Sequence, residues 1–595
     1  MLRGEIMTKA RWQSTLAHLT CLAVAAGCAT GARPVAAPVA LAPRPALPAR
    51  AADTVPTEAV FADARTAAPA LVASLVAVSP ARIVADLDGL SARLGLPMQA
   101  GHELVAWLGS SGKVGDGQRF QRFWDRLDPS APLAVAWLLA PRAGVRGYCA
   151  ALSFKDATSA RQSLDDLGNH GGPAGGVFAI EVTAGQTIWA TVKGPTLLVA
   201  SSAEVLLLGG ALTESLRTNP KLGQTVLTMM PQALARASGL SRDQIVAGVL
   251  YASGRAASRG TVTPGAQRVQ NAVAETVIKL ALEAAEVRVI LALGAQDGPS
   301  VHLEMLPSPG TDLAAMVGHQ SSYHFDERLP VRSDRTAVLA MGDLTPWLAP
   351  FTSAFALSGP AGQAMRAKVN QWFARVSDVS CVVEPVAAGF TSLCSSALAP
   401  GTPSRQAVED AVALVAAENA WEAELEGRKA TPLKVRRKQD VEIDKKIESK
   451  DPSARWLAQA MAGGEVVTTV VAVKNGRLVQ ATGPKARELV SAYGPVAGLE
   501  HAPGVSAALT ATRDQEGVAV VDVVAAVLRL ARKASGMAAN PMMALASSLP
   551  GLAEMQAPFV LAWRGGDAAV LDFAIPGSSL DHIAKVVHGL FGFSR

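Results

Sequence analysis

The stretch Val471-Ala-Val-Lys-Asn-Gly-Arg-Leu-Val-Gln-Ala-Thr-Gly-Pro-Lys-Ala-Arg-Glu-Leu-Val490 decides the fold. An apolar segment runs into Asn475-Gly476, a dipeptide typical of a tight type I′ hairpin turn. A second apolar segment follows the turn, and a Gly-Pro hinge then leads into a short amphipathic segment. The stretch therefore predicts one β-hairpin followed by one helix.

The same order of elements recurs along the chain. Ala190–Leu208 follows the pattern of 471–490, with Gly194-Pro195 at its turn. Two further pairs of hairpin–helix segments match each other: 289–310 with 559–577, and 133–154 with 379–395. Hairpins followed by helices predict antiparallel sheets with helices packed on one face, an α+β fold. We interpret the order long, short, long, short as a tandem duplication of one block.

This organisation sets the expected domains. A signal segment (1–28) and a Pro/Ala-rich tether (29–68) precede the repeats. The repeats are expected to be a long α+β copy (69–235), a short copy (236–330), a second long copy with a basic insertion at 420–455 (331–500) and a second short copy (501–595).

The N-terminal segment predicts where in the cell the protein is located. Lys9 and Arg11 precede an apolar segment that ends in Val24-Ala-Ala-Gly-Cys28. This ending resembles the lipobox of bacterial lipoproteins, and the resemblance implies that Cys28 is lipidated (palmitate included) and anchors the chain to a membrane. Ala29 is not a retention aspartate, which by the family's rules implies the outer membrane. The alternative is an ordinary signal peptide with an incidental cysteine.

The repeats also resemble exported bacterial proteins whose hairpin–helix domains have no known function. The resemblance rests on patterns such as Thr336–Asp343 and Asn475–Thr482. It implies neither an activity nor any site residue.

Catalytic and metal-binding signatures occur only as fragments. Ser110 and Lys113 have Ser-x-x-Lys spacing, but the partner motifs of penicillin-binding proteins are missing from the sequence. The segment His319–Glu327 gathers imidazoles and carboxylates, yet it falls between repeats, where a polar loop is expected. The sequence thus predicts no catalytic residue, no cofactor and no metal site.

One segment carries more charge than a hairpin needs. Between residues 428 and 450 there are nine Lys and Arg residues against four Asp and Glu. This composition predicts a solvent-exposed, highly charged β-arm. One interpretation is a contact for an anionic partner, either an envelope protein or an anionic polymer such as lipopolysaccharide. The alternative is a solvated strand edge whose charges prevent aggregation. The candidate contact residues are Arg436, Arg437, Lys438, Lys445 and Lys446.

Cysteine positions predict one disulfide. Once Cys21 leaves with the signal and Cys28 is lipidated, Cys149, Cys381 and Cys394 remain. Cys381 and Cys394 flank an expected hairpin, in a compartment that permits disulfides. We expect these two to pair and Cys149 to stay free.

Together these features favour a non-enzymatic, lipid-anchored envelope protein that acts as a scaffold or binding component of a cell-envelope complex. The alternatives are a carrier of a lipid or other apolar ligand, and a hydrolase without a recognisable motif. The net charge of +5 on 595 residues does not favour nucleic acid as a partner.

Overall fold

The structure is a computed structural model. It describes residues 70–77, 79–96, 98–111, 117–140, 145–167, 176–183, 186–218, 225–238, 241, 243–247, 264–294, 298–319, 321–329, 337–343, 345–386, 389–450, 452–494, 503–522 and 558–591.

The described residues form a mixed α+β protein divided into two units. The N-terminal unit holds the described residues within 36–241 and 284–306, and the C-terminal unit those within 242–283 and 307–592. Strand pairs within each unit, such as β1 with β2 and β10 with β11, are antiparallel. No helix among the described residues is both long enough and apolar enough to cross a membrane.

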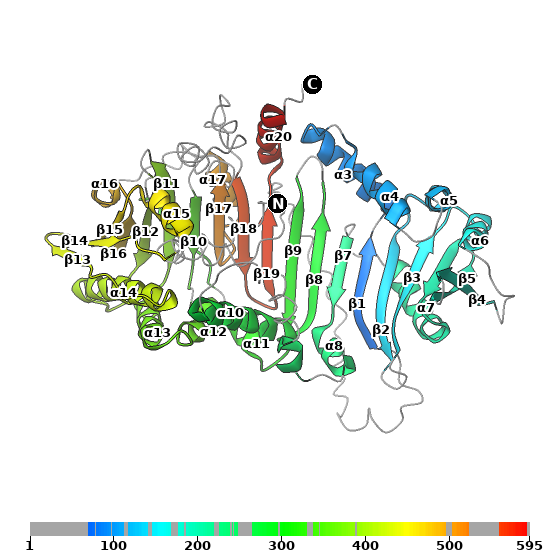
Figure 1. The fold of residues 1–595 in the computed structure, drawn as a ribbon, viewed down its shortest axis with the longest axis horizontal. Helices are drawn as coiled ribbons and strands as arrows, with labels where there is room; N and C mark the ends of the chain where they lie inside the picture. The colour runs from blue at the N-terminus through cyan, green and yellow to red at the C-terminus, as the bar shows by residue number, and fades with distance from the viewer. Residues whose placement is uncertain are drawn as a thin grey trace. The chain divides into compact units, whose positions relative to one another are not determined.

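The N-terminal unit contains one sheet (Figure 1). Its strands, in sheet order, are β4 (Phe178–Thr183), β5 (Gln186–Lys193), β6 (Thr196–Ala200), β3 (Val145–Ser153), β2 (Leu133–Ala140), β1 (Ala70–Ala77), β7 (Thr225–Met229), β8 (Ala284–Ala292) and β9 (Ser300–Pro307). Its helices are α3 (Pro80–Arg93), α4 (Ala100–Ser111), α5 (Gly117–Arg126), α6 (Ala157–Asp166), α7 (Ala203–Thr218) and α8 (Pro231–Ser238).

The C-terminal unit follows a related plan. Its strands, in sheet order, are β13 (Lys434–Arg437), β14 (Val441–Lys446), β15 (Val466–Lys474), β16 (Arg477–Thr482), β12 (Gly389–Ala397), β11 (Val379–Val386), β10 (Ala337–Met341), β17 (Gly517–Asp522), β18 (Pro558–Arg564) and β19 (Ala569–Ala574). Its helices are α10 (Pro264–Glu283), α11 (Asp312–Val317), α12 (Thr345–Phe355), α13 (Pro360–Phe373), α14 (Ser404–Leu425), α15 (Pro452–Ala462), α16 (Ala486–Ala492), α17 (Pro503–Ala511) and α20 (Gly577–Phe591).

The order of strands in the two sheets is similar. In each unit a central strand, β1 or β10, pairs with the first strand of a hairpin on one side and with β7 or β17 on the other. The hairpin β5–β6 takes the place that β15–β16 takes in the other sheet. Strand β13, at the end of the C-terminal sheet, lacks a counterpart among the described strands of the N-terminal unit. Strand β7 matches β17, yet it lies before residue 236, where the short copy was expected to start.

Local sequence signals explain several element boundaries. Asn475 and Gly476 have φ angles of 51° and 74°, so the residues expected to form the β15–β16 turn adopt the left-handed conformation that a type I′ turn requires. The side chain of Ser79 caps α3 by accepting a hydrogen bond from the Arg82 amide, and Pro80 is the first residue of that helix.

Helices cover both faces of each sheet, so the expectation of helices on one face was wrong. In β10, Val338 and Ala340 pack in a cluster with α16 and α17, whereas Leu339 and Met341 pack with α12 and α13. The other unit repeats this in β6, whose alternate residues pack against α6 and α7. The physical reason is that these strands are apolar along their whole length, and such strands are buried on both faces.

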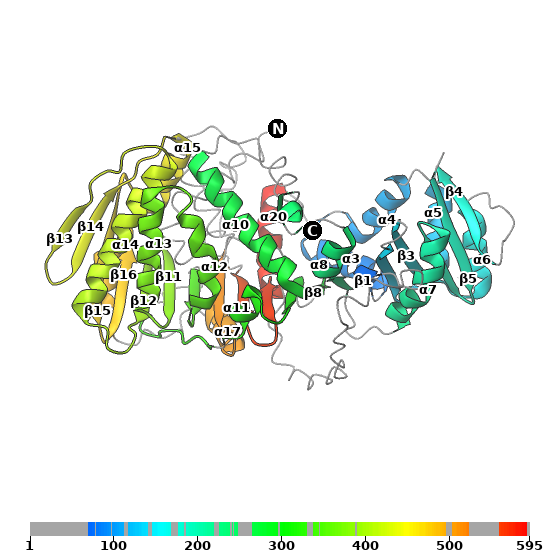
Figure 2. The ribbon, with the colours of Figure 1, turned by 90° about the horizontal axis from the view of Figure 1, so that it is seen from below.

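Helix α10 belongs to the C-terminal unit although its sequence lies in the first half of the chain. Val269 of α10 packs against Met365 of α13 and Trp421 of α14. Figure 2 shows α10, α12, α13 and α14 as a layer of neighbouring helices in this unit. Helix α14 is the longest of these and leads directly into the basic segment.

Candidate functional site

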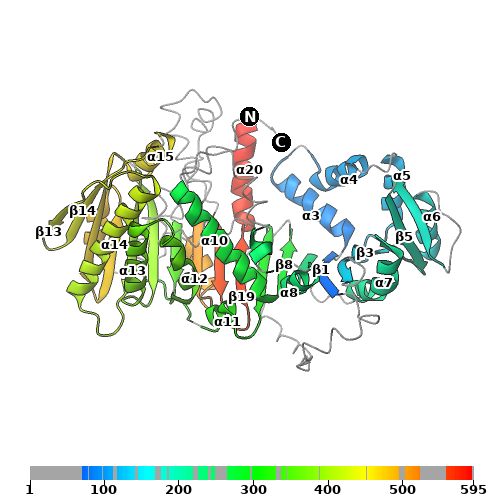
Figure 3. The same cartoon turned by 60° about the horizontal axis from the view of Figure 1, so that its bottom comes forward.

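The basic segment forms the outer end of the C-terminal sheet. Strand β13 pairs with β14, and β14 pairs in turn with β15 (Figure 3). The arm is therefore integrated into the sheet through β14, and only its last strand is an edge. All four residues of β13 are exposed, while Val441 and Ile443 of β14 are buried against α14.

The inner face of β14 determines what happens to Lys445. Residues two apart on a strand share a face, so Lys445 follows Val441 and Ile443 toward α14. On α14 the small and apolar residues Ala407, Ala411 and Val415 cover the two apolar strand residues. The helix then places Glu418 and Glu422, one turn apart, over Lys445.

These two carboxylates bind Lys445. Its Nζ lies 2.6 Å from Glu422 and 3.9 Å from Glu418, and its side chain is only 15% exposed. Burial alone would lower the pKa of Lys445, but the two carboxylates raise it, so the ammonium stays charged. Burial also raises the pKa of Glu418 to about 7, against the opposing effect of Lys445 and with help from Glu422. Lys445 is thus engaged in ion pairs within the fold. This corrects the prediction that Lys445 contacts a partner.

Arg436 is also engaged within the protein. It lies opposite Glu442 on β14 and forms ion pairs with Glu442 and, at 2.6 Å, with Asp444. Arg487 of α16 binds the same Glu442. Hydrogen bonds from Arg487 and Arg436 hold the pKa of Glu442 below its usual value, although burial opposes them. These four charged side chains therefore form an internally neutralised cluster on the outward face of the hairpin.

Three more of the nine cations have internal partners. Arg428 pairs with Glu426 at 2.7 Å, Lys446 pairs with Glu448 at 3.3 Å, and Lys450 donates to the carbonyl of Gly427.

The remaining cations have no charged partner among the described residues, and all are exposed: Lys429, Lys434, Arg437 and Lys438. Three of these lie on or directly after β13. We call β13 together with Lys438 the basic edge strand. Val435, at its centre, exposes 41% of its surface. Of the five candidate contact residues, Arg437 and Lys438 are thus free for a partner, and Arg436 and Lys446 are exposed but ion-paired. Lys445 is mostly covered by α14 and ion-paired.

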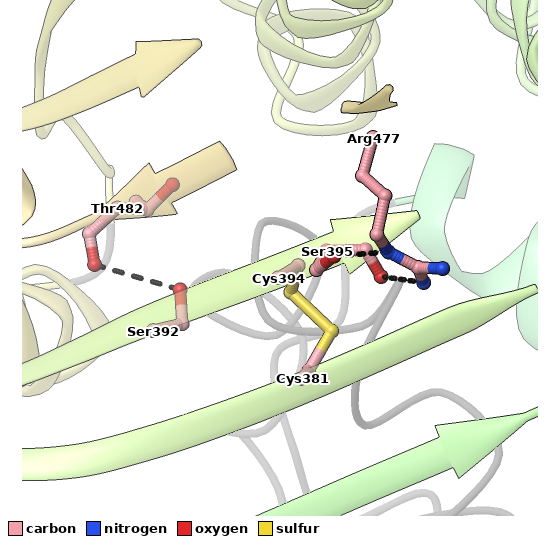
Figure 4. Close-up of a disulfide and its surroundings, with 6 residues drawn as sticks. All are labelled: Cys381, Ser392, Cys394, Ser395, Arg477 and Thr482. Atoms are coloured by element: carbon pink, nitrogen blue, oxygen red, sulfur yellow. Dashed lines mark hydrogen bonds between the residues drawn. A yellow bond between two sulfur atoms is a disulfide. The ribbon is translucent and has the colours of Figure 1, made fainter. Parts of the chain in front are cut away.

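The expected cysteine pair forms a cross-strand disulfide in the same unit (Figure 4). Cys381 of β11 lies directly opposite Cys394 of β12, with 4.0 Å between their Cα atoms. Cys149 is free and buried in the other unit. The disulfide links two central strands of the C-terminal sheet.

A buried polar network extends from the disulfide region. Ser395, next to Cys394, accepts a hydrogen bond from Arg477 Nε (Figure 4). The Ser395 hydroxyl also donates to Asp326. Asp326 also accepts from the Tyr493 hydroxyl and pairs with Arg477 at 3.0 Å. Burial would raise the pKa of Asp326, but these hydrogen bonds and the arginine charge lower it. Asp378 binds the far side of the same guanidinium.

This network gives the segment His319–Glu327 a structural role. Asp326 anchors one end, and the Tyr323 hydroxyl donates to the Leu509 carbonyl at 2.9 Å. His319 lies 3.5 Å from Asp343. Among the described residues, no group of three or more His, Cys, Asp and Glu side chains is arranged to hold a metal ion.

The N-terminal unit exposes an apolar row that sequence reasoning missed. Tyr148, Trp137, Ala73 and Met229 lie side by side on four adjacent strands, β3, β2, β1 and β7. Trp137 and Tyr148 are 37% and 38% exposed, and Met229 is exposed to the same degree. Identifying this row requires the register of the four strands, because register determines which residues lie opposite each other.

Some sequence predictions concern other parts of the chain. Cys28, the tether 29–68 and Lys113 lie outside the described residues. Comparisons of the chain with protein-family models, with curated proteins and with solved structures found no match.

Proposed function

We propose that this protein is a non-enzymatic, lipid-anchored binding component of a cell-envelope assembly, and that its basic edge strand contacts an anionic partner. The anchor in this proposal is Cys28, and the location is the outer membrane. The proposal keeps the partner class broad: an acidic envelope protein or an anionic polymer.

One observation carries the proposal. Of the nine cations between residues 428 and 450, the fold uses Arg428, Arg436, Lys445, Lys446 and Lys450 in internal contacts. Of the four cations that are left, three lie in the basic edge strand, where no carboxylate among the described residues pairs with them. Cations paired within the protein are neutralised there, whereas exposed unpaired cations attract ligands of opposite charge.

A second observation supports a binding component over an enzyme. The exposed row of Tyr148, Trp137 and Met229 is an aromatic-rich patch on a sheet face. Exposed apolar patches of this kind mark surfaces that contact other molecules. The protein would then present two surfaces of different chemistry, one cationic and one apolar, as expected of a scaffold.

We also propose that the two units arose by tandem duplication of one block, with β13 as an addition to the second copy. The support is the position-by-position match of strand orders around β1 and β10. Superposing experimentally determined structures of the two units tests this. The hairpins β5–β6 and β15–β16 should coincide, and unrelated placements of these hairpins would refute it.

The binding proposal is tested with full-length protein extracted from membranes. Retention on immobilised envelope material is measured at low and high salt for the wild type, for Arg437→Glu/Lys438→Glu, and for Arg513→Glu. Arg513 is a matched control because its side chain is 78% exposed and lies far along the chain from the basic edge strand. We expect retention to fall for the double variant alone. Equal retention of all three proteins at low salt would refute the proposal. Intact-mass measurement of the same material tests lipidation of Cys28.

A further inference from the structure

The basic edge strand has a property beyond its charge, because it is an open edge of a sheet. Among the described residues β13 pairs with β14 alone. Amide and carbonyl groups of alternate strand residues point to opposite sides, so half of those in β13 face away from β14. Open edges of this kind accept an additional strand from another polypeptide.

We propose that an extended acidic polypeptide segment adds to β13 as an eleventh strand of the C-terminal sheet. This inference rests on the proposed function and names its partner class: a protein segment rather than a polymer or a lipid headgroup. Main-chain hydrogen bonds would supply the attachment, and the side chains of the basic edge strand would select the sequence.

The side-chain pattern of β13 predicts what the added strand must carry. Lys434 and Arg437 are exposed and unpaired, so a carboxylate is favoured opposite each of them. Val435 stands beside the buried Ile443 on the sheet and is itself exposed, so an apolar residue is favoured opposite it. Arg436 is already neutralised by Glu442 and Asp444, so the residue opposite it is unconstrained. Read along β13 from Lys434, the expected pattern is acidic, apolar, any, acidic. An antiparallel added strand carries it from its own N-terminus as acidic, any, apolar, acidic.

The same features separate this proposal from an edge that merely avoids aggregation. Basic side chains on an edge strand repel unwanted strands, and most residues of β13 are basic. The exposed Val435 does not fit it, because an apolar residue at the centre of an edge favours association with another chain. Positive charge around an apolar centre makes the edge selective: it repels basic and disfavours neutral strands, and it admits acidic ones.

The test uses full-length protein and three probes. The first is a fluorescent peptide with Glu-Thr-Val-Glu at its centre. The second is the same peptide with alternate backbone amides N-methylated, which keeps the charge but removes the donors needed for strand pairing. The third is a vesicle containing phosphatidylglycerol. Binding is measured for the wild type, Arg437→Glu/Lys438→Glu and the control Arg513→Glu, together with hydrogen exchange of the β13 amides.

The proposal predicts that the unmodified peptide binds the wild type and the control equally, and binds the double variant at least about tenfold more weakly. N-methylation should abolish binding, and the unmodified peptide should slow hydrogen exchange in β13. If both peptides bind equally, or if only the vesicles bind, strand addition is overturned while the proposed anionic contact stands. If no anionic probe binds, both proposals fail.

Discussion

Replacing Lys445 with alanine should destabilise the C-terminal unit strongly, whereas the same change at its neighbour Lys446 should not. Lys445 Nζ is 2.6 Å from Glu422 and is 15% exposed, so its removal leaves two carboxylates buried without a cation. Breaking a buried ion pair by deleting one partner costs about 3–5 kcal/mol. Lys446 is 55% exposed and 3.3 Å from Glu448, and an exposed pair of this kind is worth about 0–1 kcal/mol.

The two variants form a matched pair, because they change adjacent lysines on one strand. The assay is hydrogen exchange of α14 and β14 peptides as urea is raised, read by mass spectrometry, which follows the C-terminal unit alone. We expect Lys445→Ala to lower the free energy of opening of this region by about 3 kcal/mol relative to Lys446→Ala. A difference below about 0.5 kcal/mol would refute the view that Lys445 belongs to the fold. Adding Glu422→Gln to Lys445→Ala should restore part of the loss, because one uncompensated charge disappears.

Three further predictions concern the same unit. Cys381→Ala/Cys394→Ala should lower the stability of the C-terminal unit by about 3 kcal/mol, the loop-closure value for a short loop, and finding no change in urea unfolding would count against the disulfide. Because the pKa of Glu418 is raised to about 7 from 4.5, the folded state holds an extra proton between these pH values. The Glu418 contribution to stability is therefore complete below pH 4.5 and lost as pH rises through 7, by an amount on the order of 3 kcal/mol, and Glu418→Gln should remove this slope from a pH series of unfolding curves. The pKa of Asp326 is lowered, so its contribution is present above about pH 4 and is lost as pH falls further. Asp326→Asn should lower the free energy of unfolding by about 2–3 kcal/mol at pH 7 and flatten its decrease below about pH 4. A decrease like that of the wild type would contradict the network.

Local signals predicted a turn in one unit and a helix start in the other, because short segments of sequence determine these features. Asn475-Gly476 forms the expected turn, and Ser79 caps α3 as its sequence indicates. Helix α14 follows the hairpin β11–β12 and continues past Glu418 to Leu425. This extension is what brings Glu422 over Lys445.

Features that depend on distant partners were not predictable from the sequence. In the sequence, Lys445 resembles any surface lysine in a run of charged residues. Only the packing of α14 on β14 shows that Lys445 is largely covered. A partial signal existed, since Lys445 shares the face of Val441 and Ile443, and Glu418 and Glu422 share a face of α14. The network around Asp326 joins segments far apart in the chain, and no single segment contains its pattern. The same holds for the apolar row, which only register between four strands brings together.

If a partner occupies the basic edge strand in the envelope, its lysines are shielded there, and lysine reactivity measured by mass spectrometry detects such shielding. Intact envelopes and purified full-length protein are labelled with an amine-reactive reagent, and Lys434, Lys438, Lys445 and Lys485 are compared. Lys485 of the α16 N-cap is the control, because its side chain is 45% exposed and it lies outside the basic edge strand. We expect Lys445 to be protected in both samples and Lys485 to react equally in both. Lys434 and Lys438 should react in the purified protein but be protected in the envelope. Equal reactivity of Lys434 and Lys438 in the two samples would contradict this expectation.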